Sequence, residues 1–213
     1  MYERARAGLL DAADALGVHL DAVVLVGAQA VYTHTSETEF VVDEYTTDAD
    51  LGPHGNSVAH RAKGLEAVLI DRGRRMIEAL DPNDGRSIEM SVAGPGALLV
   101  AKVHKIANRS TVPDRLNDKD ALDVLRLLQS VSTDDLCARL VSLRQDDLSK
   151  GVTDEAIAQL GSLFGSTDSI GVRMAVSAVG ILEDPDFIAS SMVALVGDLL
   201  DELAARPHQG ASN

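Results

Sequence analysis

The chain has 213 residues and a formal net charge of −14, and its residues are 46% hydrophobic, 24% charged and 3% aromatic. This composition is that of a folded globular protein, which excludes disorder throughout, and the acidic excess disfavours generic nucleic-acid binding by the whole chain. Because no apolar stretch approaches the ~20 residues of a membrane-spanning helix and the N-terminus lacks the apolar core of a signal peptide, we expect a cytoplasmic protein without a membrane passage.

The first half of the chain alternates apolar stretches with turn signals. After an amphipathic N-terminal pattern, the apolar run at 22–26 ends at Gly27 and a helical pattern starts at Ala28, which predicts a strand, a tight turn and a helix. Short β-branched or alternating stretches follow, and turn-forming sequences separate the later ones. These stretches predict five further strands, at 38–42, 45–51, 67–70, 75–80 and 87–92.

The second half is helical by its periodicity. The spacing of apolar residues predicts helices at 97–109 and 118–128, and four more at about 134–147, 154–165, 168–182 and 185–205. We therefore expect an α+β protein with an α+β domain at 1–130, a helical bundle at 131–206 and a flexible tail at 207–213. The bundle either covers the sheet or forms a dimer surface. The single cysteine, Cys137, is expected to be a buried helix residue rather than a nucleophile.

A first group of candidate functional residues lies in the first half. If residues 45–51 form a strand, Asp48 and Asp50 project from the same face about 6.5–7 Å apart, and a hard cation such as Mg²⁺ would remove their mutual repulsion. In the turn between the first strand and its helix, Gly27 and Ala28 can offer backbone N–H groups to phosphate oxygens. An Asp-x-Asp pair is also common among solvent-exposed acids, so both interpretations stay open.

The second group lies in the only basic third of the chain. Residues 61–119 carry eleven basic and eight acidic groups, whereas acids dominate before and after them. Lys102, Lys105 and Arg109 have the i, i+3, i+7 spacing that places them along one side of a helix, where they can bind phosphates. Asp120 and Asp123 lie one turn apart on the next predicted helix. Each of these residues can equally be structural, with Asp120 stabilising the first turn of its own helix.

In combination and order, these residues resemble AbiEii-type nucleotidyltransferases, minimal members of the polymerase-beta-like nucleotidyltransferase superfamily. The resemblance covers residues 20–130. It rests on Val24-Leu-Val-Gly27-Ala-Gln-Ala30, Tyr45-Thr-Thr-Asp-Ala-Asp-Leu51, Leu98-Leu-Val-Ala-Lys102, Arg109 and Lys119-Asp-Ala-Leu-Asp123. It implies a nucleotidyltransferase-like mixed sheet with flanking helices. The implied activity transfers a nucleotide from a nucleoside triphosphate to an acceptor hydroxyl, such as a transfer-RNA end.

The resemblance also implies roles for single residues. Asp48 and Asp50 would ligate Mg²⁺, Gly27 would lie in the nucleotide-binding turn, and Lys102 would contact the triphosphate. Asp120 would act as a base or orient Lys102. The acceptor hydroxyl would attack the α-phosphorus in line while pyrophosphate leaves. Because the family includes the toxin halves of bacterial toxin–antitoxin pairs, an antitoxin protein is an implied partner.

The chain departs from the family pattern in two places. Glu44 stands where an Arg usually precedes the first metal-binding Asp by four residues. In addition, Leu51 runs directly into the polar loop 52–57 instead of continuing towards a strand with a third carboxylate. Either the metal site is incomplete, or the chain lacks a segment after Leu51. Three acids remain as candidates for the third ligand: Glu66, Asp71 and Glu89.

Two other functions therefore stay open. A non-catalytic nucleotidyltransferase-like scaffold that binds a nucleotide or a protein partner is favoured by the acidic balance, by Glu44 and by the missing third acid. A small-molecule nucleotidyltransferase of the antibiotic-modifying type is favoured by the low basic content, because a compact acceptor needs fewer cations than a long RNA. A homo-oligomer is compatible with each of the three functions.

Overall fold

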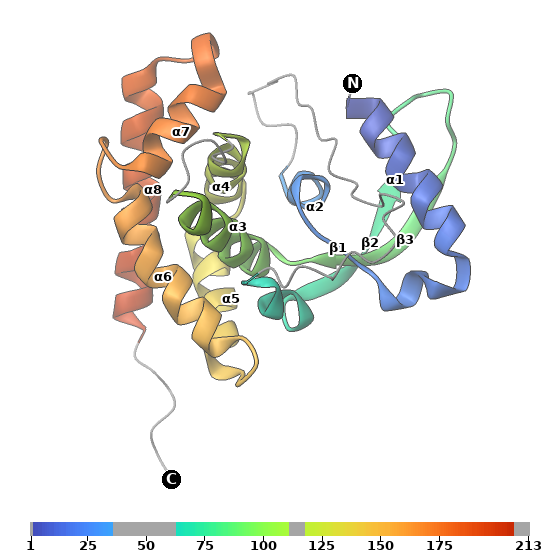
Figure 1. Ribbon diagram of the computed structural model, residues 1–213, viewed down its shortest axis with the longest axis horizontal. Helices are drawn as coiled ribbons and strands as arrows, with labels where there is room; N and C mark the ends of the chain where they lie inside the picture. Colours follow the sequence, from blue (N-terminus) through green and yellow to red (C-terminus); the bar gives the residue numbers. More distant parts are fainter. Residues whose placement is uncertain (1, 36–62, 111–117, 207–213) are drawn as a thin grey trace.

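The N-terminal half contains a mixed three-stranded sheet (Figure 1). The computed structural model describes residues 2–35, 63–110 and 118–206. β1 (Val24–Leu25) runs parallel to the central strand β3 (Ser87–Ala93), and β2 (Arg72–Glu78) pairs antiparallel on the other side of β3. β2 and β3 form a hairpin because the connection between them is rich in turn residues, and the Asn83 backbone N–H donates to Asp81 Oδ1 at 2.8 Å.

Four helical elements of the described N-terminal half accompany this sheet. They are the α-helices α1 (Tyr2–Leu16) and α2 (Ala28–Tyr32) and the 3₁₀ helices η1 (Gly17–Ala22) and η2 (Leu65–Leu69). The buried Arg6 of α1 donates to Gln29 Oε1 of α2 at 3.1 Å and to the Glu78 carbonyl oxygen of β2 at 3.0 Å. One side chain therefore holds together three elements that are far apart in the sequence.

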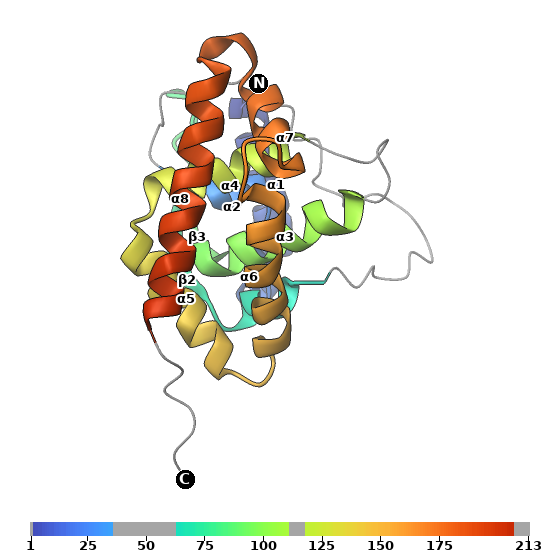
Figure 2. The same ribbon diagram turned by 90° about the vertical axis from the view of Figure 1, so that its left-hand side faces the viewer.

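Helices that follow β3 make up most of the rest of the described chain. They are α3 (Pro95–Ser110), α4 (Asp118–Ser130), α5 (Thr133–Gln145), α6 (Lys150–Phe164), α7 (Ile170–Val179) and α8 (Pro185–Ala205), with the 3₁₀ turn η4 (Gly180–Leu182) after α7. α3 packs against α4, α5 and α6, and α7 packs against α4 and α8. Figures 1 and 2 show α6, α7 and α8 on the side of α3 and α4 that faces away from the sheet. The C-terminal helices therefore pack on α3 and α4.

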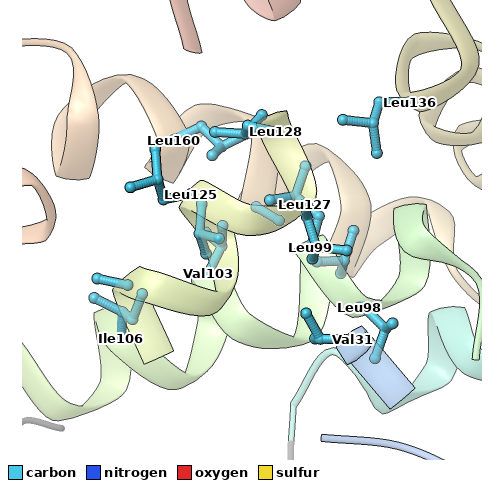
Figure 3. Packing of buried hydrophobic residues seen from close by; sticks show 14 of the residues in the cluster. Val31, Leu98, Leu99, Val103, Ile106, Leu125, Leu127, Leu128, Leu136 and Leu160 are labelled. Atoms are coloured by element: carbon cyan, nitrogen blue, oxygen red, sulfur yellow. The ribbon is translucent and has the colours of Figure 1, made fainter. Parts of the chain in front are cut away.

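The hydrophobic core is built around α3 and α4. Figure 3 shows their side chains converging with those of α2, α5 and α6, and burying one such leucine stabilises the fold by roughly 1.5–3 kcal/mol. The labelled side chains are Val31, Leu98, Leu99, Val103, Ile106, Leu125, Leu127, Leu128, Leu136 and Leu160. One cluster of buried residues extends from Leu10 to Leu203, on both sides of residue 130. The division into two domains at 130 stays a prediction, but the packing of α3 on α4 is fixed by this core.

The predicted α+β class is confirmed, with most helices in the C-terminal half. The strand predicted at 67–70 is wrong, because Gly64 turns the chain with a φ of 94° and residues 65–69 form η2. Ala67 and Val68 are buried, and η2 packs against α3 instead of joining the sheet. A short apolar run does not by itself separate a strand from a helical turn. The strands predicted at 38–42 and 45–51 and the tail at 207–213 lie outside the described residues.

The predicted helices of the second half are confirmed with shifted ends. α6 begins at Lys150 rather than at 154, and α7 ends at Val179, where Gly180 has a φ of 64°. Cys137 is buried on α5, and burial raises the pKa of its thiol, which disfavours the reactive thiolate. In the part of the chain that the structure describes, no helix combines the length and the apolar character that a membrane span requires.

Candidate functional site

The packing of α3 on α4 brings the second group of candidate residues together. The Lys102 ammonium lies between two carboxylates of α4, with Nζ 2.8 Å from Asp120 Oδ1 and 2.5 Å from Asp123 Oδ2. The Lys105 ammonium donates to Asp120 Oδ1 at 2.9 Å, and Arg109 Nη1 lies 3.4 Å from Asp120 Oδ2. The i, i+3, i+7 spacing does align these three cations, and all three meet at the carboxylate of Asp120.

The inner part of this cluster is buried. The exposed fraction of the side chain is 8% for Lys102, 3% for Asp120 and 2% for Asp123. Burial alone would lower the pKa of Lys102, but the carboxylates of Asp123 and Asp120 outweigh burial and the pKa rises. Burial likewise disfavours the charged form of Asp120, but Lys102 and Lys105 lower its pKa below the ordinary value. Lys102 and Asp120 are therefore both charged at neutral pH, as a stable buried ion pair requires.

The outer part of the cluster carries surplus positive charge. The side chains of Lys105 and Arg109 are 36% and 35% exposed, and both share Asp120 with Lys102. Asp120 and Asp123 carry two negative charges against the three positive charges of Lys102, Lys105 and Arg109, so the positive potential extends towards solvent at Lys105 and Arg109. Two preordered cations of this kind can bind an anion, above all the oxygens of phosphate groups.

Arg126 of α4 also belongs to this cluster and was not among the predicted residues. Its Nη1 lies 3.7 Å from Asp123 Oδ1 and 3.3 Å from the Tyr32 hydroxyl. Its guanidinium carbon lies 5.3 Å from the centre of the Tyr32 ring, a cation–π distance. The contact joins α4 to the last residue of α2. The i, i+3 spacing of Asp123 and Arg126 is visible in the sequence, but the tyrosine comes from a remote segment and only the fold brings it near.

The turn after β1 has the predicted order of strand, turn and helix. Gly27 precedes α2 with a φ of 78°, in the region that favours glycine, and its carbonyl oxygen accepts from the Val31 backbone N–H at 3.1 Å. α2 starts at Ala28 and has five residues. Because a helix this short offers little dipole of its own, the role of Gly27 and Ala28 in phosphate binding stays a prediction.

The predicted metal ligands Asp48 and Asp50 lie outside the described residues, as does Glu44. Within residues 2–35, 63–110 and 118–206, no three His, Cys, Asp or Glu side chains gather in a way that could hold a metal ion. Carboxylate oxygens are the donors that Mg²⁺ prefers, so the residue types of the predicted pair fit this ion. The assignment of magnesium to Asp48 and Asp50 stays a prediction.

The three acids considered as a third ligand have different surroundings. Glu66 Oε2 accepts from the Gly64 backbone N–H at 2.9 Å and so stabilises the start of η2. Asp71 is bound by Arg139 and by the first turn of α3. Glu89, on the central strand, is about half exposed and makes one long contact of 3.3 Å with Arg74, so it is the least engaged of the three.

Comparison with known proteins gives no relative for this chain: no family model, no curated protein and no solved structure matches it. The resemblance to AbiEii-type nucleotidyltransferases therefore rests on the quoted residues alone.

Proposed function

We propose that the protein is a nucleotidyltransferase that moves a nucleotide from a nucleoside triphosphate to an acceptor hydroxyl. The observation that supports this most is the convergence of Lys102, Lys105 and Arg109 on the carboxylate of Asp120. A buried anion preorders three cations, and two of them stay partly exposed. Phosphoryl-type transfer depends mainly on positioning and on neutralising phosphate charge, and preordered cations supply both.

In this proposal the outer residues of the cluster bind the substrate and the inner residues hold them in position. Lys105 and Arg109 bind the triphosphate, because their side chains combine exposure with a fixed partner. Asp120 holds them in place and orients Lys102. Lys102 itself reaches a phosphate oxygen only when its ammonium leaves one of its two carboxylates.

Asp48 and Asp50 complete the proposed site as carboxylate ligands for magnesium, by resemblance to the family. Mg²⁺, when bound, would neutralise phosphate charge next to the attacked phosphorus. The first acceptor to test is the end of a transfer RNA, since it requires only a local group of cations, and an antitoxin partner belongs to that toxin-like function. A small molecule is the second acceptor to test.

The direct assay incubates the protein with Mg²⁺ and each labelled nucleoside triphosphate, with total RNA or small molecules as acceptors. We expect label transfer by the wild type and a loss of roughly 100-fold or more in Asp48→Ala/Asp50→Ala and in Lys105→Ala/Arg109→Ala. Lys150→Ala, an exposed cation at the start of α6, is the matched control and should keep full activity. Equal incorporation of labelled nucleotide by the wild type and by Asp48→Ala/Asp50→Ala would contradict the catalytic proposal.

The non-catalytic scaffold is the second candidate function, and one observation favours it. Lys102 is bound by Asp120 and Asp123 and is almost completely buried, so the inner cluster is stable without any ligand. Calorimetry distinguishes the two candidates. Tight magnesium-dependent binding of a triphosphate without label transfer to any acceptor would support the scaffold, whereas transfer would exclude it.

A further inference from the structure

His34, which follows the end of α2, is hydrogen-bonded to two strands of the sheet. His34 Nε2 lies 2.8 Å from the Ala93 carbonyl oxygen at the end of β3, and Arg75 Nη2 of β2 lies 2.9 Å from His34 Nδ1. Arg75 Nη1 also donates to the Thr33 carbonyl oxygen at 3.3 Å. Because a guanidinium only donates, Nδ1 must accept and Nε2 must carry the proton. The geometry therefore requires the neutral imidazole.

The surroundings of His34 act against a positive charge on the ring. Burial is the largest cause that lowers its pKa below 6.5, and the bond to the Ala93 carbonyl oxygen acts in the opposite direction. Among the described residues, the charged groups that face the ring are Arg75 on β2, Arg139 on α5 and Asp71 in the turn before β2. The two arginines lower the pKa and Asp71 raises it. The net effect keeps the ring neutral at physiological pH.

We propose that His34 and Arg75 form a proton-sensitive clasp between α2 and β2. When a proton from solvent binds Nδ1, both partners become donors, the hydrogen bond between them is lost, and two cations face each other at about 3 Å. The bond from Nε2–H to the Ala93 carbonyl oxygen persists, because the imidazolium still donates there. Acidification therefore removes one of the two hydrogen bonds that Arg75 of β2 makes to the end of α2, while the longer one to the Thr33 carbonyl oxygen and the bond to β3 remain.

This inference does not depend on the nucleotidyltransferase proposal, because it concerns a contact outside the cluster of α3 and α4. Its test is a pH series of ¹⁵N-detected imidazole spectra together with urea unfolding at about pH 7.5 and about pH 5.5. For the wild type we expect the Nε2–H tautomer at the higher pH. We also expect, at the lower pH, a lower urea midpoint and smaller protection factors for the Thr33 and Thr35 amides, with each exchange rate divided by the intrinsic rate at that pH.

Two variants make the test specific. His34→Gln can donate to Ala93 and accept from Arg75 without titrating, so it should lose most of the fall in urea midpoint. Arg75→Met removes the facing cation and should raise the pKa of His34 towards 6.5. His19→Gln, at an exposed histidine of η1, is the control and should behave as the wild type does.

Three results would overturn the clasp. The first is an Nδ1–H tautomer at about pH 7.5, because the bond from Arg75 could not then exist. The second is an equal fall in urea midpoint in the wild type and in His34→Gln. The third is a pKa of His34 that does not change in Arg75→Met.

Discussion

The carboxylate of Asp71 holds the first turn of α3, because its Oδ2 accepts a hydrogen bond from the Ala97 backbone N–H at 2.9 Å. Its Oδ1 accepts from Arg139 Nη1 of α5 at 2.7 Å. Asp71 lies before β2, so one side chain caps α3 from a distant part of the chain and ties it to α5. The same helix carries Lys102 and Lys105, and the position of the cation cluster therefore depends on this capping contact.

Asp71→Ala should lower the free energy of unfolding by about 1–3 kcal/mol, because it removes the cap of α3 and the ion-pair partner of Arg139. Asp71→Asn keeps an oxygen acceptor for Ala97 but not the charge, and we expect a smaller loss. Urea unfolding of both variants measures the difference. If Asn and Ala cost the same, the charge rather than the capping hydrogen bond carries the stabilisation.

Gly94→Ala tests how closely the backbone approaches the same carboxylate. A Cβ atom on Gly94 would overlap the Asp71 side chain, so we expect a loss of about 1–3 kcal/mol from overpacking. In the Asp71→Ala background this loss should shrink, since the overlapping atoms are gone. Gly85→Ala, where an added Cβ meets nothing within 4 Å, is the matched control. Additive costs in the double variant would contradict this explanation.

The sequence predicts the cation cluster well because its geometry is local to two helices. The i, i+3, i+7 spacing aligns Lys102 with Lys105 and Arg109 on one side of α3. The one-turn spacing likewise aligns Asp120 with Asp123 on α4. The prediction therefore needed only that the two helices face each other. Leucines on the facing sides of α3 and α4 are what turn the polar residues towards one another.

Contacts between remote segments could not be predicted in this way. His34 carries no local pattern, and its two partners come from β2 and from the end of β3. Asp71 lies in the turn before β2, and nothing in the local sequence indicates that its side chain caps the remote helix α3. The strand prediction at 67–70 is wrong for a related reason. Burial of Ala67 and Val68 against α3 determines the conformation of this segment. In each case tertiary packing, not local propensity, sets the outcome.

Lys102→Met should destabilise the protein by roughly 2–4 kcal/mol, because it leaves the buried carboxylates of Asp120 and Asp123 without their shared cation. A second change, Asp123→Asn, should recover part of this loss by removing one uncompensated charge. Lys63→Met removes an exposed ion pair with Glu155 and is the control, with an expected cost near zero. Thermal or urea unfolding compares the variants. A double variant less stable than Lys102→Met would show that Asp123 stabilises the fold independently of Lys102.

The same cluster predicts how stability depends on pH at both extremes. Because the pKa of Asp120 is lower in the folded chain than its ordinary value of 3.8, the unfolded chain binds more protons in that range. The contribution of Asp120 to the free energy of unfolding is therefore fully present above about pH 3.8. It is lost as the pH falls through the lower pKa that Asp120 has in the folded chain. For Lys102 the pKa is raised above 10.5, so its contribution is complete below that value and is lost only as the pH rises through the folded pKa.

Urea midpoints measured across the acidic range separate this effect from general acid unfolding. Asp120→Asn should be less stable than the wild type at neutral pH, and its midpoint should fall less steeply below about pH 4, since the titrating group is gone. Asp168→Asn, at an exposed position between α6 and α7, should keep the wild-type slope. Equal acid slopes in the wild type and in Asp120→Asn would mean that the three cations do not stabilise the charged form of Asp120. The fixing of Lys105 and Arg109 by the carboxylate of Asp120, on which the proposed triphosphate binding rests, would then lose its physical basis.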